Sequence, residues 1–257
     1  MLPNFLVIGA QKSGTTWLYY NLKEHPEIFM PEKIKELDFF TKNSNGVHNL
    51  NKYESYFDID RKYKRYGEAT STYFWASQQP NNWLRYKSIF RRDIPKMVYD
   101  VLGPETKIIV SLRNPVHRAI SAYIHHCVKG RLTDPFPKIY SREILKKKMG
   151  IIHMGFYSEH LEAWLEYFPN MLVLVYEDDI KTNPDQGLNK LTSYLEVSKH
   201  KFNRAGHIIH GKRTTEFDSL ITKQDKFELL EIYEDDVAKL KKLLNRPLKS
   251  WQEFLHL

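Results

Sequence analysis

A glycine-rich loop near the amino terminus holds the first residues that could do chemistry. Gly9 and Gly14 have the spacing of the phosphate-binding pattern G-x-x-x-x-G-K-[ST], and the loop lies between an apolar run, residues 5–8, and a helix-like run. Its backbone amides and the following helix N-terminus would present hydrogen-bond donors and positive potential to an anion. The lysine position of the pattern holds Thr15, and a lysine lies three residues earlier, at Lys12. We therefore predict a phosphate site for a donor other than a nucleoside triphosphate.

A second candidate anion site follows a β-branched run, residues 107–112. Arg113 lies where this predicted strand leaves the sheet, and Ser121 falls two turns into the helix predicted over residues 115–128. An arginine can bind a phosphate through two parallel hydrogen bonds, and a serine hydroxyl can add a third. The alternative is an arginine in an ordinary salt bridge and a serine on a helix surface.

The elements that must position these residues alternate along the chain. Continuous apolar runs indicate buried parallel strands, and amphipathic stretches indicate helices. Alternating strands and helices imply an α/β fold with ligands bound outside the carboxyl ends of the strands. We expect a P-loop-like three-layer fold, with a central, mostly parallel sheet flanked by helices. The predicted strands are residues 4–9, 36–40, 67–70, 107–112 and 171–176, and the predicted helices are 15–25, 93–102, 115–128, 155–168, 184–195 and 224–244.

The composition of the chain indicates which ligands it could bind and in which cellular compartment it could act. A net charge of +8 favours anionic ligands, although a merely basic cytosolic protein would also carry it. Cys127 is the only cysteine, so an intramolecular disulfide is excluded. No window approaches the roughly 20 apolar residues of a membrane span, and the amino terminus lacks a leader pattern. We therefore expect a cytoplasmic protein without a membrane span.

Four segments resemble the sulfotransferase family. Residues 11–18 resemble its 5′-phosphosulfate loop, and residues 112–123 resemble its 3′-phosphate strand and helix. Residues 157–169 and 175–184 match two further family segments, so that the resemblance covers roughly residues 4–195 in the family's order. The family uses 3′-phosphoadenosine-5′-phosphosulfate (PAPS) as sulfuryl donor and releases adenosine 3′,5′-bisphosphate (PAP). The length of the chain and the lack of an internal repeat or linker favour one domain over residues 1–257, and the resemblance makes it a sulfotransferase domain that is expected to need no metal.

The resemblance also implies which residues bind the donor. In the second anion site, Arg113 and Ser121 would hold the 3′-phosphate. Near the C-terminal side, Lys212 and Arg213 would lie over the 3′-phosphate and adenine. The phosphosulfate loop contributes Lys12, Ser13, Gly14, Thr15, Thr16 and Trp17.

The segment around Glu36 resembles the carbohydrate-type branch, which includes heparan sulfate sulfotransferases and bacterial relatives. That branch has a glutamate, two further residues and then two phenylalanines, which here are Phe39 and Phe40. The resemblance makes Glu36 the base that removes a proton from a hydroxyl or amine acceptor. Lys12 would then neutralise the charge that grows on the leaving phosphate during an in-line displacement. The alternative for Glu36 is a solvated acid among charged neighbours.

The acceptor is expected to be a small molecule or a glycan. Animal heparan sulfate enzymes often have a lysine where this chain has Ala69, which argues against a heparan-like acceptor. Thr70 and Thr72 could line the acceptor site or lie on a strand surface. Residues 73–92 are aromatic and basic, which suits sugar rings or anionic groups, and equally an amphipathic helix that packs on the sheet. Carbohydrate, lipid-linked and polyketide-type hydroxyls all stay open.

Three alternatives compete with this interpretation. A histidine could replace Glu36 as base, the candidates being His25, His125 and His126, although a lone histidine is more often a cap or surface residue. A P-loop kinase or NTPase using ATP and magnesium would explain the glycine loop, and residues 172–178 could then hold the metal. A nucleic-acid-binding protein would rest on charge and aromatic content alone. We expect no nucleic-acid partner, and a monomer suffices for the chemistry, although the sequence leaves the oligomeric state open.

Overall fold

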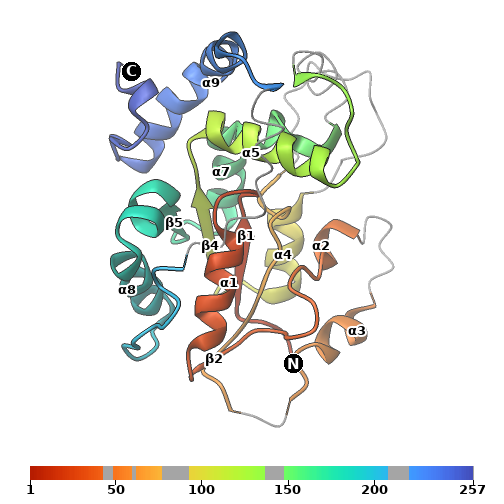
Figure 1. The fold of residues 1–257 in the computed structure, drawn as a ribbon. Coiled ribbons are helices and arrows are strands. Elements are labelled where there is room, and N and C mark those ends of the chain that lie inside the picture. Colours follow the sequence, from red (N-terminus) through yellow and green to blue (C-terminus); the bar gives the residue numbers. More distant parts are fainter. Residues whose placement is uncertain (43–48, 60–61, 77–92, 137–147, 208–219, 257) are drawn as a thin grey trace.

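The computed structural model describes residues 1–42, 49–59, 62–76, 93–136, 148–207 and 220–256. Within these ranges five strands form one parallel sheet in the order β2-β3-β1-β4-β5 (Figure 1). The strands are β1 (Phe5–Gly9), β2 (Ile28–Phe29), β3 (Arg65–Ala69), β4 (Lys107–Leu112) and β5 (Leu172–Val175).

Helices connect the strands. The α-helices are α1 (Thr15–Glu24), α2 (Phe39–Lys42), α3 (Leu50–Ser55), α4 (Ile94–Leu102), α5 (Pro115–Val128), α7 (Tyr157–Tyr167), α8 (Pro184–Leu195) and α9 (Lys223–Leu244). A π-helix, η3 (Tyr176–Thr182), follows β5, and the short 3₁₀ turns are η1 (Lys148–Gly150), η2 (His153–Gly155) and η5 (Gln252–Phe254). Among the described residues, none of these helices has the length and apolar character needed to cross a bilayer.

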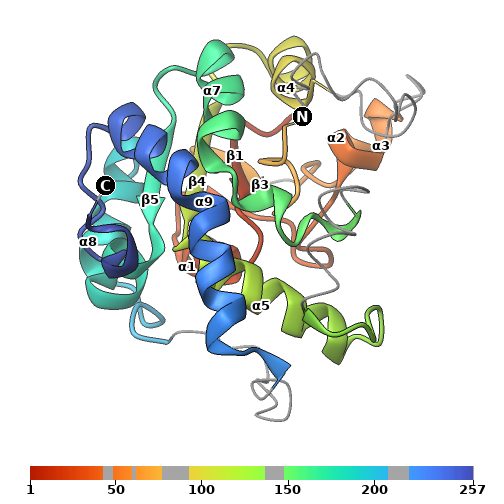
Figure 2. The ribbon, with the colours of Figure 1, turned by 90° about the horizontal axis from the view of Figure 1, so that it is seen from above.

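Strand β1 shows why the fold has three layers. All its residues are buried, and they alternate between two cores, as successive side chains of a strand must. Leu6 and Ile8 belong to the core under α4, α7 and α9, whereas Phe5 and Val7 belong to the core under α1 and α8. Helices α5 and α9 lie over the carboxyl end of the sheet (Figures 1 and 2). The expected P-loop-like three-layer α/β fold is confirmed; the single domain over residues 1–257 stays a prediction.

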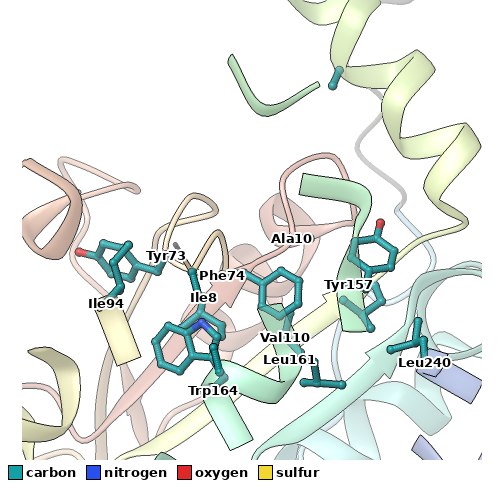
Figure 3. Close-up of a cluster of buried hydrophobic side chains, with 14 of the residues drawn as sticks. Ile8, Ala10, Tyr73, Phe74, Ile94, Val110, Tyr157, Leu161, Trp164 and Leu240 are labelled. Carbon is teal, nitrogen blue, oxygen red and sulfur yellow. The ribbon is translucent and has the colours of Figure 1, made fainter. Parts of the chain in front are cut away.

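The larger core joins the sheet to α7 and to the turn after β3. Its members come from segments far apart in the chain, and Figure 3 shows several of their side chains together. Among the core residues labelled in this view are Ile8, Val110, Phe74, Tyr157, Leu161 and Trp164.

Most predicted elements are confirmed, and three are residue for residue: the strand 107–112 and the helices 115–128 and 184–195. The strand predicted at 36–40 is wrong, because α2 begins at Phe39. Both phenylalanines turn towards one aromatic cluster, where Phe39 stacks on Tyr53 at 4.1 Å between ring centroids. A strand would send the two rings to opposite faces. Fully burying one such ring contributes roughly 1.5–3 kcal/mol, so the pair outweighs a local strand preference.

Candidate active site

The loop between β1 and α1 is shaped to receive an anion. Gly14 caps α1 with φ 90°, and a Cβ there would lie 2.9 Å from Tyr176 Cδ2, so the position has room only for glycine. Lys12 also has positive φ, at 67°. The Ala10 amide donates to the Ser111 carbonyl at 2.8 Å, which ties the loop to β4. The first-turn amides of α1 have no intrahelical acceptor, and no acidic residue lies in that turn.

Arg113 joins the second strand end to this loop. Its Nη1 donates to the Lys12 carbonyl oxygen at 3.3 Å, and its guanidinium lies over the Tyr176 ring at 5.2 Å from the centroid. Burial lowers the pKa of Lys12, and the nearby charges of Arg113 and Lys35 lower it further. The structure therefore brings Lys12 and Arg113 together, as predicted, in a site with excess positive charge. Their binding of a donor stays a prediction.

Glu36 lies against the same loop. Lys35 Nζ is 3.0 Å from Glu36 Oε1 and donates to Thr15 Oγ1 at 3.4 Å. Ser71 Oγ donates to the same carboxylate oxygen of Glu36 at 3.0 Å. The Glu36 side chain is still 37% exposed, so an acceptor can reach it. This carboxylate is thus held in place by two side chains while it stays partly exposed, and its role as base stays a prediction.

Lys35 and Ser71 are site residues that sequence reasoning missed. Lys35 had one available signal, its position next to Glu36 in a chain whose ligands are expected to be anionic. Ser71 had none, because a small polar residue after a strand is common. Their shared contact with Glu36 arises only when the 35–36 segment crosses the turn that follows β3.

The remaining loop residues divide by burial. Ser13 is fully buried, and Thr15 is buried and accepts a hydrogen bond from Lys35. Thr16 is half-buried in the first turn of α1. Trp17 is 2% exposed, and its Nε1 donates to the Ala205 carbonyl at 3.0 Å. The Trp17 indole therefore anchors the segment near Ala205, and its N–H is already used.

Ser121 lies on α5, about 10 Å along the helix axis from the cap residue Asn114 at 1.5 Å per residue. Its side chain is half-buried. The Asn114 side chain caps α5, and the Asn114 amide donates to Glu177 Oε1 at 3.2 Å. Glu177 Oε2 also accepts from Trp251 Nε1 at 2.9 Å. This brace fixes the start of the helix that carries Ser121.

In the kinase interpretation, Glu177 or Asp178 would bind the metal, but both carboxylates already accept hydrogen bonds from other residues. Glu177 accepts from the Asn114 amide and from Trp251, and burial raises the pKa of Glu177. Asp178 Oδ2 accepts from Arg246 Nη2 at 2.8 Å. Both carboxylates thus hold other segments of the chain through hydrogen bonds in this structure.

The three candidate histidines have different surroundings. His25 caps the far end of α1, where its Nδ1 accepts from the Glu27 amide at 3.1 Å. His126 is buried, and burial lowers its pKa to about 4. His125 is half-buried; burial and the charge of Lys12 lower its pKa, whereas the charge of Glu36 raises it. Of the three, His125 thus feels the charges of both Lys12 and Glu36.

Other predictions fall outside the site or outside the described residues. Lys212 and Arg213 lie in the range 208–219, which the structure does not describe. Residues 77–92 of the aromatic segment are also outside the described residues. Thr70 is fully buried, and its contact with an acceptor stays a prediction. Thr72 Oγ1 donates to Asp38 Oδ1 at 3.3 Å.

Known proteins share both the sequence pattern and the architecture. The chain matches the sulfotransferase domain family over residues 2–210. It is 30% identical over 215 residues to human bifunctional heparan sulfate N-deacetylase/N-sulfotransferase 3, which covers 77% of this chain and 23% of that protein. The chain therefore spans about a quarter of the length of this relative. Membrane-associated sulfotransferase kil1 of Dictyostelium discoideum is 25% identical over 341 residues, covering 98% of this chain and 67% of the relative.

Two solved structures have the same fold. A sulfotransferase from Alicyclobacillus acidocaldarius has a TM-score of 0.75 and 25% identity, covering 98% of this chain and 99% of its own. Mouse sulfotransferase SULT7A1 complexed with PAP has a TM-score of 0.56 and 17% identity, covering 91% of this chain and 83% of its own.

The parallel sheet and the loop before α1 define a P-loop-like α/β protein. With the family match over most of its length, the assignment becomes more specific. The chain belongs to the PAPS-dependent sulfotransferase family.

Proposed function

We propose that this protein transfers a sulfuryl group from PAPS to a hydroxyl or amine of an acceptor, with Glu36 as general base. The observation that carries the proposal is the meeting of three groups at one loop. Lys12 contributes an ammonium, Arg113 binds the Lys12 carbonyl, and Glu36 reaches the loop through Lys35. A phosphate-binding site that also holds a reachable carboxylate suits group transfer to a nucleophile that must lose a proton.

The described residues fit an anionic donor. Burial lowers the pKa of Lys12, the charges of Arg113 and Lys35 lower it further, and an anion between these cations would relieve their repulsion. Arg113 Nε is buried without a hydrogen-bond partner. Unpaired buried donors are costly unless a ligand satisfies them. A phosphate near Arg113 would supply the acceptor that this group lacks.

When bound, the donor supplies an activated sulfuryl group that moves in line from its bridging oxygen to the attacking acceptor atom. Glu36 accepts the proton of the attacking hydroxyl or amine, and its position is held by Ser71 and Lys35. Lys12 places its ammonium where negative charge grows on the departing phosphate. Arg113 keeps the Lys12 backbone in place, so that the loop and the second anion site act together.

We propose a carbohydrate as the acceptor. This proposal is based on the relatives of the chain and not on a contact in the structure. The human relative is named for heparan sulfate N-sulfotransfer, and this chain spans only part of it. The glutamate that is followed after two residues by Phe39 and Phe40 is typical of the carbohydrate-type branch. Both the N-linked and the O-linked position stay within the proposal, because a carboxylate can take a proton from either.

His125 is a second candidate for the base, and one observation favours it. Its imidazole feels the charges of Lys12 and Glu36, and its lowered pKa keeps it neutral at physiological pH, which is the form that accepts a proton. If His125 is the base, His125→Gln removes more of kcat than Glu36→Gln does.

Two measurements test the proposed function. Thermal-shift titration with PAP, compared with ATP plus magnesium, should give stabilisation by PAP in proportion to its occupancy. Equal or better stabilisation by ATP plus magnesium would favour the kinase or NTPase alternative. Radiolabelled PAPS with a panel of oligosaccharides, lipids and small alcohols then identifies the acceptor, and transfer to none of them together with no PAP binding rejects the proposal.

A further inference from the structure

Glu68 is a fully buried carboxylate at the end of β3 that the proposed chemistry does not use. Three hydroxyls from two segments donate to it. Tyr53 OH and Tyr73 OH donate to Glu68 Oε1 at 2.6 and 3.0 Å, and Thr70 Oγ1 donates to Oε2 at 2.8 Å. A buried acid with this many donors is a built feature of the fold, since an unpaired one would be strongly disfavoured.

Two of these hydroxyls also hold the segment that carries Glu36. The Asp38 amide donates to Thr70 Oγ1 at 3.3 Å, and the Phe40 amide donates to Tyr73 OH at 3.3 Å. The Leu37 amide donates to Glu68 itself. Three backbone amides of the segment 36–40 are therefore linked to the Glu68 carboxylate. The Leu37 amide bonds to it directly, and the Asp38 and Phe40 amides bond to it through Thr70 and Tyr73.

The polarity of these bonds depends on Glu68. Thr70 and Tyr73 each accept a hydrogen bond from a backbone amide and donate their own hydroxyl hydrogen bond to the carboxylate. A carboxylate offers about four acceptor sites, which the three hydroxyls and the Leu37 amide occupy. Removing the carboxylate would leave both relay hydroxyls without an acceptor, at a cost of about 1–3 kcal/mol for each buried group.

The relay hydroxyls are themselves fixed by packing. The ring of Tyr73 lies in the large core, and its hydroxyl points away from Phe74 and Trp164 (Figure 3). The Phe40 ring packs edge-on against Tyr73 at 5.4 Å between centroids. The segment is thus held by apolar anchors and by polar bonds at the same place.

We propose that Glu68 is a positioning residue for catalysis, because its buried carboxylate holds the segment 36–40 so that Glu36 stands against the phosphate loop. This inference rests on the proposed function. Its physical basis is that a displacement of about 1 Å in a catalytic group can lower a rate by ~100-fold. Glu68 itself touches neither donor nor acceptor.

Glu68→Gln is the direct test, and Tyr73→Phe and Thr70→Val are milder variants that each remove one relay. We expect kcat with the acceptor found in the panel to fall about 10–100-fold. The acceptor KM and the PAP dissociation constant, measured by calorimetry, should stay within about twofold, because the donor site is built on other strand ends.

Tyr233→Phe is the matched control. Tyr233 is as buried as Tyr73, and its hydroxyl donates to the Ile152 carbonyl at 2.8 Å, away from the segment 36–40. This variant should lose stability to a similar extent and keep its kcat. If Tyr73→Phe and Thr70→Val keep kcat as Tyr233→Phe does, at a temperature where all are folded, the proposal is wrong.

Hydrogen exchange separates this inference from the proposed function. The amides of Leu37, Asp38 and Phe40 should exchange faster in Glu68→Gln whether or not the acceptor is known. A wild-type protein that neither binds PAP nor transfers sulfate removes the proposed function and the catalytic role of Glu68 with it. Faster exchange in the variant would then leave only a structural anchor, and unchanged exchange would reject the anchor as well.

Discussion

Arg113 Nη1 donates to the backbone carbonyl of Lys12 at 3.3 Å, so the ends of two neighbouring strands share one contact. Strands β1 and β4 pair in parallel, and their carboxyl ends therefore meet at the same edge of the sheet. The contact makes the loop and the second anion site one unit. A donor with two separate phosphates would be bound across it.

Arg113→Ala should weaken PAP binding by about 1.5–3 kcal/mol, the range for a hydrogen bond to a charged group. That is roughly a 10- to 150-fold rise in the dissociation constant measured by calorimetry. Arg204→Ala is the control, because Arg204 is exposed and lies over Tyr20 instead of the loop. Unchanged PAP affinity in Arg113→Ala would remove this residue from the donor site.

Glu36→Gln should lower kcat by at least about 100-fold and leave PAP binding close to intact, because general-base catalysis contributes 10²–10⁴-fold and the base contacts the acceptor. Glu32→Gln is matched in chemistry and lies four residues earlier, where Glu32 pairs with Lys23 at 3.3 Å. It should keep full activity. A joint fall in PAP affinity and kcat would mean that Glu36 has a structural role.

Gly14→Ala should destabilise the fold and abolish PAP binding, because the new Cβ meets Tyr176 and moves the first turn of α1. Gly130→Ala introduces the same kind of strain at φ 63°, but nothing lies within 4 Å of its Cβ. We expect the unfolding free energy to fall by about 1–3 kcal/mol more for Gly14→Ala. Equal losses for the two variants, with PAP affinity retained, would contradict the close approach to Tyr176.

Binding of PAP should take up protons at alkaline pH. The pKa of Lys12 is lowered by burial and by its cationic neighbours, and a bound anion would raise it again. Between the pKa of the free and of the bound site, binding then adds a proton to Lys12, so PAP affinity falls as pH rises through that window. Calorimetry at about pH 9 in two buffers of different ionisation enthalpy measures this uptake.

Lys12→Met should remove the proton uptake as well as most of the affinity. Lys64→Met is the control, since Lys64 is exposed just before β3 and far along the strand from the loop. Proton uptake that persists in Lys12→Met would assign it to another group.

The elements around the site follow from short-range patterns. A short apolar run rich in β-branched residues favours a buried strand, and Pro115 at the first turn of α5 marks the start of that helix. For the same reason the loop before α1 and the position of Arg113 could be predicted, because both directly follow such strands.

The segment 36–40 could not be predicted in this way. Its two phenylalanines fit a strand by local preference, but the aromatic cluster around Tyr53 and the amide bonds to Thr70 and Tyr73 determine its path. Those partners lie 13 to 33 residues away along the chain, where periodicity carries no information.

The sequence alone predicts the phosphate loop, its missing nucleotide-type lysine and the candidate base Glu36, because each pattern involves neighbours only a few residues away. The contacts of Glu36 with Lys35 and Ser71, the brace of Glu177 and the buried carboxylate of Glu68 appear only in the folded structure. Local propensity governs backbone geometry, whereas the meeting of side chains from separate strands depends on the register of the sheet and the packing of the core.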